Sequence, residues 1–72
     1  MDIAKLEKKQ TLRREEAAQQ LRDIADELGS GNDIVMERDG LRFTVKVPDE
    51  VTMKVEVEIE DDKREFEIEL TW

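Results

Sequence analysis

The chain has 72 residues and a formal net charge of −8, from 20 acidic and 12 basic side chains, and it contains neither His nor Cys. These counts exclude a disulfide framework, a thiolate nucleophile, a zinc–thiolate site and any histidine base or ligand. The acidic excess argues against nucleic-acid binding, which needs a basic surface to displace phosphate counterions. Apolar residues recur periodically, so we expect a single folded domain over residues 1–72.

The first predicted element is a short strand over residues 2–10. Ala4, Leu6 and the stem of Lys8 would share one side, and charged side chains the other. A longer first helix is the alternative for this segment.

A helix is predicted over residues 12–28. Its apolar side chains follow the i, i+3, i+4, i+7 spacing of one helical face, at Leu21, Ile24, Ala25 and Leu28. Thr11 is the expected N-cap, and Gly29 suits the left-handed position that ends a helix.

A hairpin is predicted over residues 33–47, because Asp39-Gly40 is typical of a two-residue turn with positive φ at both positions. One register then aligns apolar residues with apolar residues and opposite charges with each other. The facing pairs are Met36 with Phe43, Ile34 with Val45, Glu37 with Arg42, and Asp33 with Lys46.

A second hairpin is predicted over residues 51–72, after a connection at Pro48. Its turn is either the two residues Asp61-Asp62 or a four-residue loop that also includes Lys63 and Arg64. Both strands alternate strictly between apolar and polar residues. The predicted order is β-α-β-β-β-β, an α+β fold. Its mostly antiparallel sheet of four to five strands carries one helix on one face, above a core one helix deep.

Several segments resemble the amphi-Trp domain family over nearly the whole chain. They are the Arg14–Ala18 helix opening, residues 21–28, the Gly29-Ser30-Gly31 stop, the Pro48-Asp49 connection and the alternating Phe66–Trp72 end. The resemblance implies a small domain of archaea, especially haloarchaea, and of bacteria. It implies a fold with no assigned activity, and it carries over no catalytic residue.

Charge is distributed unevenly, with ten acidic and three basic residues in 48–72. In either register of the second hairpin, outward Glu residues face each other, which is destabilising. Three interpretations stay open: a solvated face, compensation by Lys5 and Lys9 from a first strand lying beside the last, or a docking face for a basic partner or a divalent cation. Trp72 either caps the core or anchors a partner.

We therefore expect a non-enzymatic protein-interaction or self-association module, with an unknown protein partner or a weak homodimer. The alternative is a salt-adapted or divalent-cation-binding domain that uses its acidic sheet face. We expect no cofactor, metal site, nucleic acid or membrane. The start lacks a signal peptide pattern, so a cytoplasmic location is expected. The candidate interaction surface comprises Glu56, Glu58, Glu65, Glu67, Glu69, Trp72, Lys5 and Lys9.

Overall fold

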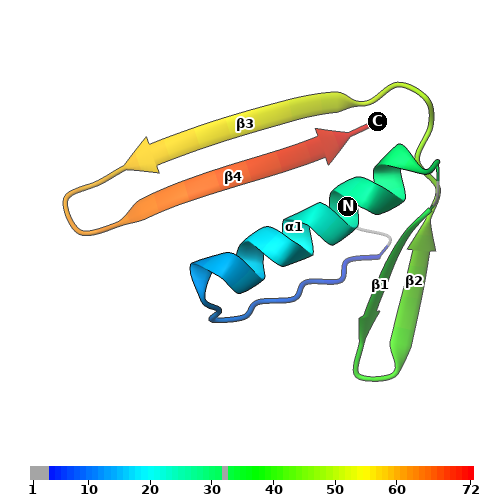
Figure 1. The fold of residues 1–72 in the computed structure, drawn as a ribbon, viewed down its shortest axis with the longest axis horizontal. Coiled ribbons are helices and arrows are strands. Elements are labelled where there is room, and N and C mark those ends of the chain that lie inside the picture. The colour runs from blue at the N-terminus through cyan, green and yellow to red at the C-terminus, as the bar shows by residue number, and fades with distance from the viewer. Residues whose placement is uncertain (1–3, 32) are drawn as a thin grey trace.

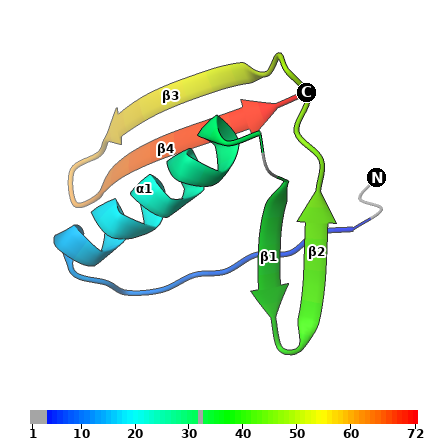
Figure 2. The ribbon, with the colours of Figure 1, turned by 45° about the vertical axis from the view of Figure 1, so that its right-hand side comes forward.

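The computed structural model describes residues 4–31 and 33–72, and it contains one helix and four strands (Figure 1). In chain order they are α1 (Arg14–Gly29), β1 (Ile34–Arg38), β2 (Leu41–Val45), β3 (Thr52–Ile59) and β4 (Arg64–Thr71). The α+β class is confirmed. The single sheet is wrong, because the strands form two separate antiparallel hairpins, β1–β2 and β3–β4. The helix lies between the two hairpins (Figures 1 and 2).

Residues 4–13 form no strand, so the strand predicted over 2–10 is absent from its described part; residues 2 and 3 lie outside the described residues. Side chains rather than a backbone ladder hold this segment. Arg38 Nη1 donates to the Glu7 carbonyl oxygen at 2.6 Å, and Gln20 Nε2 donates to Gln10 Oε1 at 3.1 Å. The segment runs along the side of α1 that faces away from β3–β4 (Figures 1 and 2).

The start of α1 lies two residues later than predicted, with Arg13 rather than Thr11 as the N-cap. Arg13 has an extended backbone, and its N–H donates to Glu16 Oε1 at 3.1 Å. The Ala17 N–H donates to the Arg13 carbonyl oxygen at 3.0 Å. A carboxylate in the first turn thus satisfies a free backbone donor and complements the helix dipole, which takes the place of the expected Thr cap.

The end of α1 is formed by three residues. Gly29 is the last helical residue, and Ser30 caps the helix with both its N–H (3.0 Å) and its Oγ (2.7 Å) donating to the Asp26 carbonyl oxygen. Gly31 has φ 73° and adopts the left-handed conformation that the sequence assigned to Gly29. The stop is therefore at the predicted place, and the residue that turns the chain is two positions further on.

The observed register of each hairpin agrees with one predicted from the sequence. In β1–β2, Ile34 lies opposite Val45, and Met36 lies opposite Phe43. Asp39 and Gly40 have φ of 51° and 78°, which confirms the two-residue turn. In β3–β4 the turn is the shorter of the two alternatives, with Glu60 N–H donating to the Lys63 carbonyl oxygen at 2.8 Å.

The predicted closed core is wrong, because none of the side chains in residues 4–31 and 33–72 is fully buried. The half-buried apolar residues are Leu6, Ala18, Leu28, Ile34, Met36, Phe43, Val47 and Leu70. The radius of gyration is 14.1 Å, whereas a compact domain of this length has about 11 Å. The chain is thus folded locally into helix and hairpins without closing a core.

Candidate functional site

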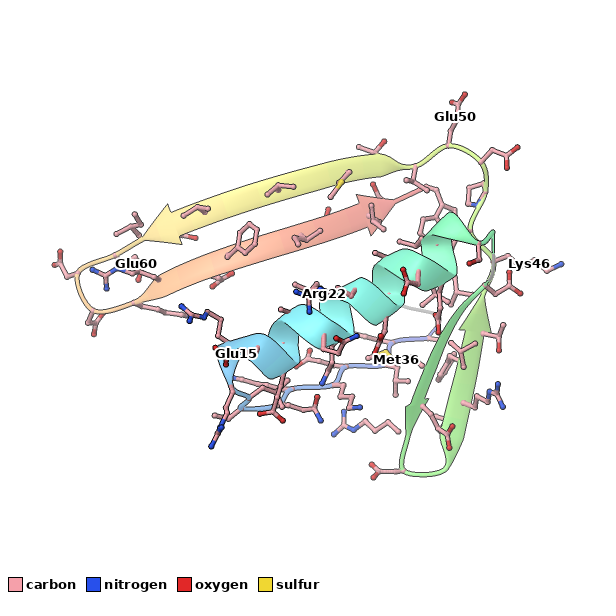
Figure 3. All side chains as sticks on the ribbon, in the orientation of Figure 1. Glu15, Arg22, Met36, Lys46, Glu50 and Glu60 are labelled. Carbon is pink, nitrogen blue, oxygen red and sulfur yellow. The ribbon has the colours of Figure 1, made fainter. Side chains whose placement is uncertain are left out.

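The β3–β4 hairpin has two chemically opposite faces. Its register places Val55 opposite Ile68 and Val57 opposite Phe66 on one face. The apolar face comprises Met53, Val55, Val57, Ile59, Phe66, Ile68 and Leu70. The other face carries the acidic ladder, which comprises Glu56, Glu58, Glu65, Glu67 and Glu69. Glu50, in the connection before β3, and Glu60, at the turn, mark the two ends of the hairpin (Figure 3).

An apolar groove separates α1 from one end of this apolar face. Its two adjoining parts have volumes of about 310 and 260 Å³. Both parts are lined by Leu21 and Ile24 from α1 and by Ile68 and Leu70 from β4. We call this the apolar groove. The helical spacing of Leu21 and Ile24 and the alternation of Ile68 and Leu70 direct all four side chains into it.

The turn end of the apolar face lies outside this groove. Val57, Ile59 and Phe66 line neither part of it, and they are 66, 70 and 63% exposed. This end of the hairpin lies clear of α1 in Figure 1. We call these three residues the overhang. The helix covers only part of the apolar face, and the overhang has no cover from the described chain.

Trp72 lines the part of the apolar groove that also includes Ile34 and Val45. Its side chain is 59% exposed. Trp72 continues the apolar row as expected, because it lines the groove together with Leu70. The expectation that it caps a closed core is wrong, because no closed core forms.

The acidic ladder has the predicted like-charge pairs, with Glu56 opposite Glu67 and Glu58 opposite Glu65. Two lysines on the same face offset part of the negative charge at the two ends of the acidic ladder. Lys54 Nζ lies 3.1 Å from Glu56 Oε2, and Lys63 Nζ lies 3.6 Å from Glu65 Oε2. Exposed pairs of this kind contribute little to stability.

Compensation by Lys5 and Lys9, one of the three open interpretations, is wrong. The segment that carries both residues forms no strand and passes on the opposite side of α1 from β4 (Figures 1 and 2). Lys9 lines an open cleft of about 380 Å³ whose acidic side chains are Glu7, Glu37 and Asp39. The cause is topological: without a first strand, nothing brings the N-terminal lysines to the last strand.

The centre of the acidic ladder has a perturbed carboxyl group. The pKa of Glu67 is raised above its ordinary value of 4.5, chiefly by a side-chain hydrogen bond with Glu65. Partial desolvation and repulsion from Glu56, Glu65 and Glu69 raise this pKa further. A proton shared between two carboxylates relieves their repulsion, which explains the direction.

Replacing Glu67 with Gln is expected to stabilise the protein slightly at neutral pH. A raised pKa means that the folded chain binds more protons than the unfolded chain just above pH 4.5, so stability falls as pH rises through the raised pKa of Glu67. The variant lacks this group, so its stability changes less across that window. Urea unfolding at pH 4.5 and pH 7 measures both effects.

Glu50→Gln is the matched control, because it removes the same charge from the connection before β3. Equal stabilisation by both substitutions would show that net charge, and not the ladder, is responsible.

Metal ligation has no geometric support in the described residues, among which no three acidic side chains are grouped to hold an ion. The helix of the described chain also lacks the length and apolar character needed to cross a bilayer.

Sequence reasoning missed the apolar groove and the overhang, because it assigned their residues to a closed core. A signal for them was present. The hairpin carries seven apolar side chains on one face, whereas the helix offers only Leu21, Ile24 and Leu28 as large partners. A helix stripe this small leaves part of such a face uncovered.

Comparison with known proteins gives one match. No curated protein matches the chain, and no solved structure does. The model of the Amphi-Trp domain family matches residues 2–72. The match includes the helix, both hairpins and the terminal Trp72. The chain therefore belongs to the Amphi-Trp domain family.

Proposed function

We propose that this domain is a small non-enzymatic module that binds a protein chain, either another protein or a second copy, through the apolar face of β3–β4. The overhang carries the proposal. Val57, Ile59 and Phe66 lie side by side on one face, and each is more than 60% exposed. Soluble monomers rarely leave large contiguous apolar patches in water, and such patches mark interaction sites.

The hairpin also has free edges that suit protein binding. It is a two-stranded sheet, so β3 and β4 each have one edge without a strand neighbour from residues 4–31 and 33–72. Unpaired backbone N–H and C=O groups on such edges can pair with an added strand. Apolar contact with the partner would supply affinity, and backbone pairing would fix the orientation of the added strand.

A non-enzymatic role agrees with the chemistry of the site. The one carboxyl group with a raised pKa in the described chain, that of Glu67, lies on the open acidic ladder. Acid–base catalysis by carboxyl groups relies on an enclosed site that separates their pKa values. The apolar groove carries no titratable group among the residues that line it.

The acidic ladder supports a second candidate, an acidic face suited to high salt or to divalent cations. The hydrogen bond with Glu65, desolvation and repulsion from neighbouring carboxylates raise the pKa of Glu67, and cations would screen the repulsion. Titration with Mg²⁺ while backbone amide shifts are recorded tests it. Saturable shifts at Glu56, Glu58, Glu65 and Glu67 are expected if Mg²⁺ binds there. Shifts that do not saturate would show that Mg²⁺ only screens the charges.

If the domain binds a protein chain through the apolar face of β3–β4, that face either binds an apolar dye or is covered by another chain. Molecular mass and the binding of an environment-sensitive apolar dye are measured on the same sample. We expect a complex larger than the 8.5 kDa chain, or a monomer that binds the dye. A monomer that binds no dye contradicts the proposal, because its own chain would then cover the face.

A further inference from the structure

The surface area of the chain is larger than that of a typical folded monomer of its mass. It exposes 7031 Å², whereas a folded monomer of 8.5 kDa exposes about 4,650 Å². The excess is therefore roughly 2,400 Å² per chain. Obligate homodimers bury about 2,000–5,000 Å² in total. The excess on two chains, roughly 4,800 Å², lies within this range, so the exposed area is large enough for a stable homodimer interface.

The two uncovered features are both apolar and lie at opposite ends of β3–β4. The overhang projects apolar side chains from the turn end of β3–β4, and the apolar groove at the other end receives apolar side chains between α1 and β4. One chain cannot insert its own overhang into its own groove, because they occupy opposite ends of one hairpin. In a two-fold dimer each overhang can enter the partner's groove, and both contacts form at once.

The charges permit this arrangement. The acidic ladder lies on the opposite face of the hairpin from the overhang. Contact between apolar faces therefore leaves both ladders in water. Two chains of charge −8 still repel each other, and salt screens that repulsion. A dimer joined by apolar faces is strengthened by salt, whereas one joined by lysines on the ladder would be weakened.

We propose that the chain forms a two-fold homodimer in which Val57, Ile59 and Phe66 of each copy pack into the apolar groove of the other. This inference rests on the proposed protein-binding function and names its partner. An isolated two-stranded hairpin is at best marginally stable. The second copy extends the second layer, which α1 supplies for only part of β3–β4.

The first test is mass and unfolding as a function of protein concentration. We expect twice the 8.5 kDa chain mass, and an unfolding midpoint that rises with protein concentration and with NaCl. A dye-binding monomer overturns the homodimer and leaves the docking function standing. A monomer that binds no dye overturns both. A larger oligomer, or a dimer weakened by salt, overturns this two-fold arrangement.

A matched pair of variants tests the surface. Val57→Lys and Thr52→Lys each add one positive charge to β3, on the apolar and the acidic face respectively. A charge in the centre of an interface is expected to weaken the dimer about thirtyfold or more. Thr52→Lys is expected to leave the dissociation constant within about threefold, since it lies on a wet face. Equal effects of the two would overturn the assignment.

A measurement on the unmodified protein covers the case in which Val57→Lys does not fold. A dimer prepared from labelled and unlabelled chains is examined for nuclear Overhauser effects between chains. Effects between the Phe66 ring and the Leu21 or Ile24 methyl groups are expected. If the Phe66 ring shows these effects only within one chain, the proposed exchange of overhangs is wrong.

Discussion

Replacing Leu70 with Ala is expected to lower the free energy of unfolding by about 2 kcal/mol, the lower end of the cost of truncating a buried leucine, because Leu70 is half-buried. Leu70 is the one half-buried side chain of the described β4, and it lines both parts of the apolar groove. It lies opposite Met53, so its loss also leaves that side chain without its cross-strand neighbour. Urea unfolding followed through the fluorescence of Trp72, the single tryptophan, measures the change.

Thr71→Ala is the control for Leu70→Ala, because it truncates the next residue on the opposite face of β4. Its expected cost is below about 1 kcal/mol, the span of strand propensity. Similar losses from both substitutions would mean that β4 does not pack against α1.

Replacing Gly40 with Ala is expected to cost about 1–2 kcal/mol, the penalty for a side chain in the left-handed region. Gly40 has φ 78°, and an added Cβ would have no heavy atom within 4 Å. The cost is therefore conformational and not a clash. It falls on the turn that sets the register of β1–β2. Thermal unfolding of the variant measures it.

Gly29→Ala is the opposite case in the same protein. Gly29 is the last residue of α1, it has no positive φ, and its Cβ position is also open. Helix propensity predicts a gain of up to about 1 kcal/mol. Opposite signs for the two Gly→Ala substitutions are expected. Destabilisation by both would contradict the helical backbone at Gly29.

The elements that sequence predicted well are those defined by neighbouring residues. Asp39-Gly40 sets a two-residue turn, and every pair in β1–β2 then follows from counting. The alternation along β3 and β4 in the same way identifies the apolar face and the acidic ladder. Such signals act over a few residues and need no knowledge of the rest of the chain.

The assembly of these elements was predicted less well, because it depends on whether surfaces match. The apolar row of β3–β4 runs along eight-residue strands, whereas the large apolar side chains of α1 are confined to the part from its middle to its C-terminal end, at Leu21, Ile24 and Leu28. Alternation alone shows that a face is apolar and does not show what covers it. The acidic ladder was found from sequence; the overhang was not.

The N-terminal segment shows a related limit. Its weak alternation at Ala4 and Leu6 suggested a strand, yet two side-chain hydrogen bonds, from Arg38 and Gln20, hold it as an extended chain. Long-range side-chain contacts of this kind leave no periodic pattern in a sequence. The position of Lys5 and Lys9 depended entirely on that strand.

The separation of the two hairpins has a consequence for how the protein opens. The ladders of β1–β2 and β3–β4 share no backbone hydrogen bonds, and residues 46–51 join them. Breaking one ladder therefore removes no hydrogen bond from the other. We therefore expect the amide protons of β3–β4 to exchange at rates different from those of β1–β2. The expected result is opening as two units that share one helix.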